Sequence, residues 1–246
     1  MIISNLAYKT DCITTPSASM KELIEGYGIK NRIEVIPNAI HLVSFREDDE
    51  LKRREIKRKY HLKEEDKIIL FVGRVASEKS IDKIIQALAI IKKRGMGKEK
   101  LLIVGSGPDM DELKQLTRTL KLEKDVIFAG TVSYEEIQHY YKMAYVFTIT
   151  STTETFGIVT IEALASGVPV LAVKAPGAID ILTNGLDGLL VDNDTIKFAD
   201  ALEKIIREPE LREKLSEGAL KTSEKYSIDT ISERMLNLCL LYTSPS

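Results

Sequence analysis

The sequence predicts an α/β fold with a doubly wound parallel sheet. Short β-branched runs alternate with segments of helical periodicity along most of the 246 residues. The runs are continuously apolar rather than alternating in polarity, which is typical of parallel strands that helices cover on both faces. Strand–helix alternation over this length favours a Rossmann-like arrangement.

Six strands are expected, at residues 68–72, 101–104, 126–128, 145–150, 168–173 and 189–191. Three of the segments between or after them carry apolar residues at helical spacing, at 81–91, 110–120 and 196–206. We therefore predict that residues 67–231 form one Rossmann-like domain.

The first 45 residues are organised differently. A strand at 11–15, a helix at 17–27 that ends at Gly28, and a strand at 32–36 are expected there. One strand–helix–strand unit cannot bury both faces of a sheet, so we interpret residues 1–45 as the remnant of a domain whose earlier part is absent. Residues 46–66 are dense in charge and are predicted to be a linker that contains a helix with a solvated face.

Residues 232–246 are interpreted as the end of a C-terminal helix followed by a non-native tail. The hypothesis concerns the last eight residues, Cys-Leu-Leu-Tyr-Thr-Ser-Pro-Ser. A back-translation of this segment resembles a sequencing-library adapter read in frame, and the raw nucleotide read tests the idea.

Composition excludes several classes of protein. The chain has 35 Lys and Arg against 37 Asp and Glu, a net charge of −2, which argues against nucleic-acid binding through phosphate contacts. Two distant cysteines and three isolated histidines give neither a disulfide framework nor a recognisable metal site. No run reaches the roughly 18 apolar residues of a membrane span, and residues 1–6 do not form a signal peptide. We therefore expect a cytoplasmic protein.

The loop after the first strand of the large domain is a candidate anion site, because ligands of open α/β sheets bind beyond the carboxyl ends of the strands. It contains Gly73, which permits a sharp turn, the cations Arg74 and Lys79, and Ser80 as a candidate helix cap. A guanidinium fork and an ammonium together suit a diphosphate. Two solvated cations in a loop are the alternative explanation.

A glycine-rich loop follows the second strand, with the sequence Gly-Ser-Gly-Pro-Asp at 105–109. It looks like a phosphate loop, but Asp109, Asp111 and Glu112 lie at the start of the next helix. Carboxylates there satisfy the helix dipole and repel an anion. We interpret this loop as a structural turn.

The segment at 153–170 is the most informative. A helix is predicted to begin near Gly157, and its first turn has no acidic side chain, so its backbone N–H groups are free for an anion. Glu154 and Glu162 are eight residues apart, roughly 12 Å if all were helical, which is too far for paired acid/base carboxyls. The spacing suits two carboxylates that accept hydrogen bonds from different hydroxyls of one extended ligand. The alternative interpretation is that one is an ordinary surface glutamate and the other a glutamate near a helix start. It explains each residue singly, but it does not explain why both occur together among small residues.

This Glu-x(7)-Glu segment, read with Gly73-Arg74 and Glu78-Lys79, resembles the nucleotide-sugar-binding half of retaining GT-B glycosyltransferases of the group 1 (family four) type. The resemblance extends from about residue 11 to residue 231 and includes the segments at 35–38, 105–108 and 209–212. It implies the C-terminal domain of a GT-B fold, preceded by a remnant of the N-terminal, acceptor-binding domain.

The resemblance also implies roles for individual residues. Arg74 and Lys79 would neutralise the donor diphosphate, Glu162 would accept from the ribose hydroxyls, and Glu154 would hold hydroxyls of the transferred sugar. Glu154, Arg74 and Lys79 are thus the implied catalytic residues. The implied donor-binding set adds Gly73, Val132 near the base, and the backbone around Phe156, Gly157, Ile158 and Val159. No cofactor or metal is expected, because the two cations stand where other transferases use a metal ion.

The implied reaction is transfer of a hexose from a nucleotide diphospho-sugar, UDP-glucose being the commonest guess, with retention of configuration. The acceptor would be a glycolipid, a polysaccharide or another glycoconjugate, and it would bind through the missing N-terminal domain. Residues 15–37 are similar to diacylglycerol glucosyltransferases, which implies peripheral association of the full-length enzyme with the inner membrane face. Catalysis in such enzymes needs two domains to close around the donor, so we expect this fragment to bind donor and to transfer slowly or not at all.

Two alternatives stay open at this point. A sugar-nucleotide epimerase of the same architecture would also bind a nucleotide sugar between two domains. A non-catalytic nucleotide- or partner-binding module would use the apolar strands only as a core.

Overall fold

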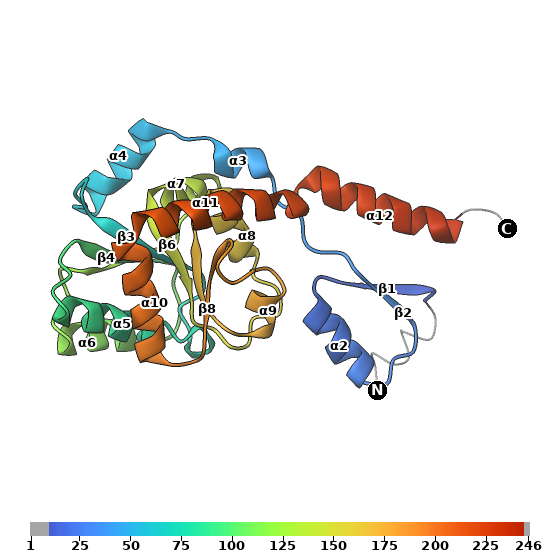
Figure 1. Cartoon of the computed structure of the whole chain (residues 1–246), viewed down its shortest axis with the longest axis horizontal. Coiled ribbons are helices and arrows are strands. Elements are labelled where there is room, and N and C mark those ends of the chain that lie inside the picture. Colours follow the sequence, from blue (N-terminus) through green and yellow to red (C-terminus); the bar gives the residue numbers. More distant parts are fainter. Residues whose placement is uncertain (1–9, 244–246) are drawn as a thin grey trace.

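Six parallel strands form the main sheet, in the order β5-β4-β3-β6-β7-β8 (Figure 1). The strands are β3 (Lys67–Val72), β4 (Glu99–Val104), β5 (Val126–Gly130), β6 (Ala144–Ile149), β7 (Val170–Val173) and β8 (Gly188–Val191). The computed structural model describes residues 10–243. Every neighbouring pair is parallel, so the predicted fold class is confirmed.

Helices cover both faces of this sheet because alternate strand residues point to opposite sides. Leu70 belongs to one buried cluster, whereas its neighbours Ile69 and Phe71 belong to the other. The first cluster includes buried residues of α7 (Tyr134–Met143) and α8 (Ile158–Ala165). The second includes α5 (Ile81–Lys93), α6 (Met110–Thr119) and α10 (Thr195–Arg207), and α11 (Pro209–Ser223) packs against both α8 and α10.

The sheet reverses its winding direction between β3 and β6. From β3 the chain proceeds outward through β4 to β5, then returns to place β6 on the other side of β3 and continues to β7 and β8. Such a switch point leaves a crevice beyond the carboxyl ends of the two central strands. The loops that follow β3 and β6 carry Gly73, Arg74, Lys79, Glu154, Phe156 and Gly157 of the predicted site residues, whereas Val132 follows β5 and the others lie in α8.

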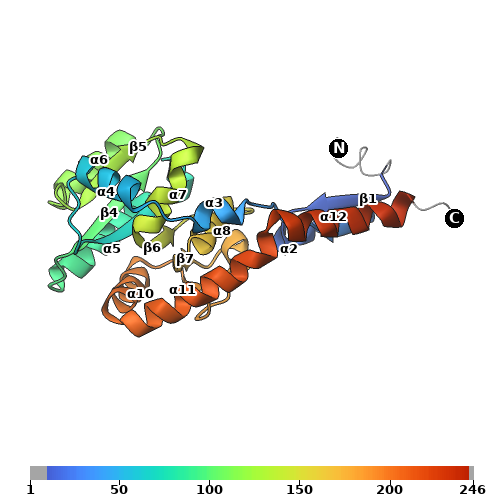
Figure 2. The same ribbon diagram turned by 90° about the horizontal axis from the view of Figure 1, so that it is seen from above.

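The predicted strand–helix–strand unit near the start of the chain is present. It consists of β1 (Cys12–Thr15), α2 (Ala18–Gly26) and β2 (Arg32–Val35), with the two strands parallel in a sheet of their own. Its core is small, built on the buried residues Ile29 and Ile33. The unit lies beside the last helix, α12 (Ile228–Thr243), as both ribbon views show (Figures 1 and 2), and Arg234 of that helix donates to the Val35 carbonyl at 2.8 Å.

Two short helices, α3 (Leu42–Arg46) and α4 (Glu50–Lys59), connect this unit to the main sheet. The second is the charged helix predicted within residues 46–66, and Ile56 is its buried residue. The domain boundaries proposed from the sequence stay predictions.

The last helix continues through residues 239–243, the first part of the predicted non-native tail. Residues 244–246 of that tail, like residues 1–6, lie outside the described residues. Within residues 10–243, no helix has both the length and the apolar character that a membrane crossing requires.

Candidate functional site

The loops after β3 and β6 are joined at the switch point of the sheet. Thr150, just beyond β6, donates its hydroxyl to the carbonyl oxygens of Lys79 at 2.8 Å and Ser80 at 2.9 Å. These bonds hold the end of the cationic loop against the strand that leads to Glu154. This role of Thr150 was not predicted, because its partners are 71 and 70 positions earlier in the chain.

The prediction that the Ser80 side chain caps the following helix was wrong. Ser80 does precede α5, but it has a left-handed backbone with φ of 49° and its side chain makes no capping hydrogen bond. It follows a short 3-10 turn, η1 (Ser77–Lys79), that ends at this residue. The Thr150 hydroxyl holds the carbonyl oxygens of Lys79 and of Ser80 itself. The backbone of Ser80 is therefore not in the extended conformation that a capping side chain needs.

Two of the predicted site residues form a direct ion pair. The Lys79 ammonium lies 2.6 Å from a carboxylate oxygen of Glu154, and the side chains are 23% and 22% exposed. The predicted loop cation and the predicted loop carboxylate therefore meet across the switch point. Both keep enough exposure to exchange their partner for a ligand.

The second predicted cation, Arg74, is exposed, and its side chain makes no ion pair within residues 10–243. Its neighbour Gly73 begins the loop, with its N–H donating to the Val104 carbonyl at 3.0 Å. Arg74 therefore stands in the same loop as Lys79 but is not held against Glu154 or Glu162.

The loop at 105–109 is a structural turn, as preferred from the sequence. A Cβ on Gly105 would lie 1.8 Å from the carbonyl oxygen of Gly73, and the φ of Gly105 is +134°. Val75 donates to the Ser106 carbonyl at 3.0 Å. The glycine is thus explained by close packing against the cationic loop.

Helix α8 begins where it was predicted to begin, with Gly157 in the capping position. Its first turn has no acidic residue, and the cap supplies no side-chain hydrogen bond. Of the residues predicted to offer backbone contacts, Ile158 is exposed, whereas Val159 and Phe156 pack partly against the core. This helix start thus meets the physical requirements for receiving a negative charge.

Glu162 is buried, which is unusual for a carboxylate and differs from the exposure that its position alone favours. Its Oε2 accepts a hydrogen bond of 2.8 Å from the Tyr141 hydroxyl. Burial raises the pKa of Glu162 to about 7, and the Tyr141 hydrogen bond opposes that rise. Tyr141 is a functional candidate that sequence reasoning missed, since it lies on a different helix.

The structure brings some predicted residues together and not others. Lys79 and Glu154 touch, while Glu162 is directed toward α7. Val132, beyond β5, is partly buried against the first core cluster. Within residues 10–243, no group of three or more His, Cys, Asp or Glu is placed to hold a metal ion.

A pocket of about 210 Å³ adjoins Glu154. Its walls come from helix α2 on one side and, on the other, from the loop after β6 and the first residue of α9 (Pro176–Ile179). The two are tied together, because the Ser17 hydroxyl donates to the Thr155 carbonyl at 3.1 Å. The lining residues are Ser19, Met20, Leu23, Thr152, Thr153, Glu154, Thr155 and Pro176.

The chain is similar in sequence to a known protein family. The model for glycosyl transferases group 1 matches residues 52–222. An alpha-monoglucosyldiacylglycerol synthase of Streptococcus pneumoniae is 31% identical over 215 residues, which are 86% of this chain and 48% of that protein. A D-inositol 3-phosphate glycosyltransferase of Frankia alni is 29% identical over 225 residues, covering 87% of this chain and 54% of that one. The chain thus spans about half the length of these curated relatives.

Solved structures show the same fold. HepE of Anabaena in complex with UDP superposes with a TM-score of 0.87 at 22% identity, covering 97% of this chain and 66% of that chain. Sucrose-phosphate synthase of Thermosynechococcus elongatus gives a TM-score of 0.86 at 25% identity, with 99% and 62% covered.

Proposed function

Because this chain belongs to the glycosyl transferases of group 1 and has the fold of the C-terminal domain of GT-B enzymes, we propose that it binds the nucleotide diphospho-sugar donor of a retaining hexosyltransferase. UDP-glucose is the first donor to test. The acceptor is a hydroxyl of a glycolipid, a polysaccharide or another glycoconjugate. The observation that carries the proposal is the Lys79–Glu154 pair at the switch point, directly before a helix start with no acidic side chain in its first turn.

The proposed donor lies with its diphosphate between the cationic loop and the start of α8. Lys79, with Arg74 from the same loop, offsets the negative charge that grows on the diphosphate as it leaves. The backbone N–H groups at the start of α8 add the positive end of the helix dipole. In this proposal the two cations do the work of a metal ion, so the reaction needs none.

The two carboxylates contact different parts of the donor in this proposal. Glu154 accepts hydrogen bonds from hydroxyls of the transferred sugar, and Glu162 accepts from those of the ribose. When the sugar C1–O bond to the diphosphate breaks, the acceptor oxygen forms its bond to C1 on the same face. The acceptor proton passes to the departing phosphate oxygen, which gives retention and a nucleoside diphosphate as the second product.

Names and complexes of similar proteins support this choice of donor and acceptor. HepE, a structural neighbour, has been solved with UDP and with UDP-glucose. The Streptococcus relative is named for a glucosylated diacylglycerol product, and the Frankia relative for an inositol phosphate acceptor. A hydroxyl on a lipid-linked or phosphorylated acceptor is therefore the class to test first.

Calorimetric titration of the chain with UDP, UDP-glucose, GDP and ADP tests donor binding directly. We expect UDP and UDP-glucose to bind with micromolar to low-millimolar dissociation constants. Absence of binding by every nucleoside diphosphate, to protein shown to be folded by circular dichroism, contradicts the proposal. Incubation of the protein with UDP-glucose alone then distinguishes a transferase from an epimerase, which would change the donor without acceptor.

A further inference from the structure

Tyr141 is a fully buried tyrosine whose hydroxyl reaches a carboxylate. It lies on α7, has none of its surface exposed, and donates to Glu162 Oε2 at 2.8 Å. Burial raises the pKa of Tyr141 well above its ordinary value. The hydroxyl therefore keeps its proton, and remains a hydrogen-bond donor, at neutral pH. The contact joins two helices on the same face of the sheet.

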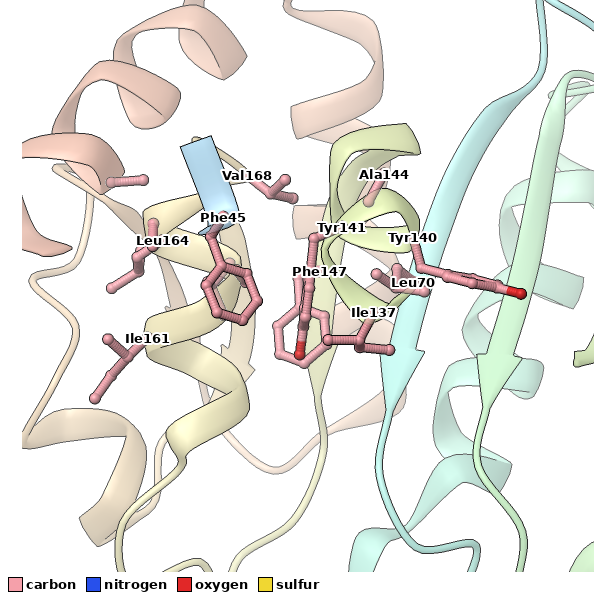
Figure 3. Close-up of a cluster of buried hydrophobic side chains, with 14 of the residues drawn as sticks. Phe45, Leu70, Ile137, Tyr140, Tyr141, Ala144, Phe147, Ile161, Leu164 and Val168 are labelled. Carbon is pink, nitrogen blue, oxygen red and sulfur yellow. The ribbon is translucent and has the colours of Figure 1, made fainter. Parts of the chain in front are cut away.

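The ring of Tyr141 is fixed by two other aromatic rings. It meets Phe45 of α3 at 6.0 Å and Phe147 of β6 at 5.5 Å between ring centroids, both edge-to-face. Figure 3 shows all three of these side chains within the cluster of buried residues. Its hydroxyl therefore occupies one position, and the Glu162 carboxylate is oriented before any ligand arrives.

Within residues 10–243, the other elements packed against α8 bring one unpaired cation to that helix: the Lys142 ammonium of α7 donates to the Ser166 carbonyl at 3.5 Å, and it is not among the influences on the pKa of Glu162. Tyr134, also on α7, is the second tyrosine that interacts electrostatically with it. The α3 cation Arg46 is paired with Glu224 at 2.7 Å, β7 contains only apolar residues, and the buried face of α11 has no titratable side chain. Burial and the Tyr141 hydrogen bond are thus the two influences that set the pKa of Glu162.

We propose that Tyr141 is a positioning residue for the donor: it holds one carboxylate oxygen of Glu162 so that the other accepts hydrogen bonds from the ribose hydroxyls. The inference rests on the proposed function, in which Glu162 contacts the ribose. Tyr141 itself touches no substrate. Its effect reaches the donor only through the orientation and the charge state of Glu162.

Two consequences separate this role from a purely structural one. An ionised carboxylate accepts hydrogen bonds better than a neutral acid, so donor affinity rises with pH through the pKa of Glu162, about 7. Loss of the Tyr141 hydroxyl removes the influence that lowers this pKa, so the rise moves to higher pH. The preference for a ribose over a 2′-deoxyribose also depends on an oriented Glu162.

The test is calorimetric titration of the chain with UDP and with 2′-deoxy-UDP, between about pH 5.5 and about pH 8.5. The variants are Tyr141→Phe, Glu162→Gln and the double variant. Tyr140→Phe is the matched control, because Tyr140 lies on the same helix and its hydroxyl contacts Tyr60 at 3.3 Å instead.

We expect Tyr141→Phe to bind UDP roughly tenfold more weakly near neutral pH, as for loss of one hydrogen bond to a charged group. Its affinity should rise at higher pH than that of the wild type, and it should discriminate less between UDP and 2′-deoxy-UDP. Glu162→Gln should retain only the pH dependence that the terminal phosphate of UDP itself contributes, and adding Tyr141→Phe to it should change little. Tyr140→Phe should behave as the wild type.

An unchanged pH profile and an unchanged 2′-deoxy-UDP ratio in folded Tyr141→Phe overturn the inference and leave the proposed function intact. Additive losses in the double variant overturn it as well. If Tyr141→Phe does not fold, the Glu162→Gln variant tests the inference. A pH profile and a ratio of UDP to 2′-deoxy-UDP affinity equal to those of the wild type would exclude a role of Tyr141 that acts through Glu162. Failure of the folded wild type to bind any nucleoside diphosphate contradicts the proposed function itself.

Discussion

Lys79 and Glu154 are 75 positions apart in the sequence, yet the ammonium of one lies 2.6 Å from a carboxylate oxygen of the other. Each therefore neutralises the other in the absence of ligand. In the proposed donor site, an arriving diphosphate competes with Glu154 for Lys79, and the freed carboxylate becomes available to sugar hydroxyls. We therefore expect substitutions of the two residues to have different effects on the affinity for UDP.

Lys79→Ala should weaken binding of UDP roughly 10- to 100-fold, the loss of one charge-assisted hydrogen bond to phosphate. Calorimetric titration measures it, with Lys93→Ala as the control, because Lys93 is an exposed lysine at the end of α5. Equal UDP affinities for Lys79→Ala and Lys93→Ala would show that Lys79 does not bind the diphosphate.

Glu154→Gln should leave UDP affinity unchanged or raise it, because Lys79 loses its competing carboxylate. The same variant should lose affinity for UDP-glucose relative to UDP, since an amide accepts hydroxyl hydrogen bonds less strongly than a carboxylate. The ratio of the two dissociation constants is the measurement. A ratio identical to the wild type counts against contact between Glu154 and the sugar.

Glu162 should make the stability of the chain depend on pH. Its pKa in the folded chain is about 7, against an ordinary value of 4.5, so the folded state retains a proton that the unfolded state loses. This contribution is complete below about pH 4.5 and is lost as the pH rises to about 7. It amounts to about 3 kcal/mol in the free energy of unfolding.

Urea unfolding of wild type and Glu162→Gln at about pH 5 and about pH 8 isolates this contribution from that of other carboxylates. The variant should gain stability relative to the wild type at the higher pH. A difference between the two proteins that is the same at both pH values would show that Glu162 titrates normally.

Gly105→Ala should destabilise the chain by about 2 kcal/mol or more, because the new Cβ would lie 1.8 Å from the Gly73 carbonyl oxygen. The displacement of the cationic loop should also weaken UDP binding. Gly97→Ala is the matched control, since a Cβ there meets no atom within 4 Å, and we expect it to change stability by less than about 0.5 kcal/mol. Thermal unfolding of both variants provides the comparison.

Thr222→Val should cost about 1–3 kcal/mol of unfolding free energy. The Thr222 hydroxyl donates to Asp187 Oδ2 at 2.8 Å, and both side chains are buried. The substitution leaves a buried carboxylate oxygen without that donor at nearly unchanged side-chain volume. Thr119→Val, at an exposed helix position, is the control, and a loss of equal size there would mean that the Asp187 contact is not the cause.

The main sheet was predictable because each of its strands is an apolar run long enough to identify by itself. The runs at 68–72 and 101–104 lie within β3 and β4, and parallel pairing follows from the helices between them. The start of α8 was predictable for a similar reason, since Gly157 precedes the helix without an acidic first turn. These features depend on residues near one another in the sequence.

The features that were missed depend on tertiary packing. The left-handed backbone of Ser80 occurs where Thr150, 70 positions later, bonds to its carbonyl. The burial of Glu162 depends on how α8 sits against α7, and its contact with Tyr141 spans 21 positions and two helices. No local pattern encodes such distances, although a glutamate among apolar and small residues was a signal that it would be unusual.

The tie between the Ser17 hydroxyl and the Thr155 carbonyl has a practical consequence. Thr155 is the residue after Glu154, so the strand–helix–strand unit is anchored to the loop that ligand exchange would rearrange. Tyr27, at the far end of the same helix, is 66% exposed. An environment-sensitive fluorescent dye attached at position 27 should therefore change its emission when a nucleotide sugar binds. The strand–helix–strand unit can in this way report binding at the loop.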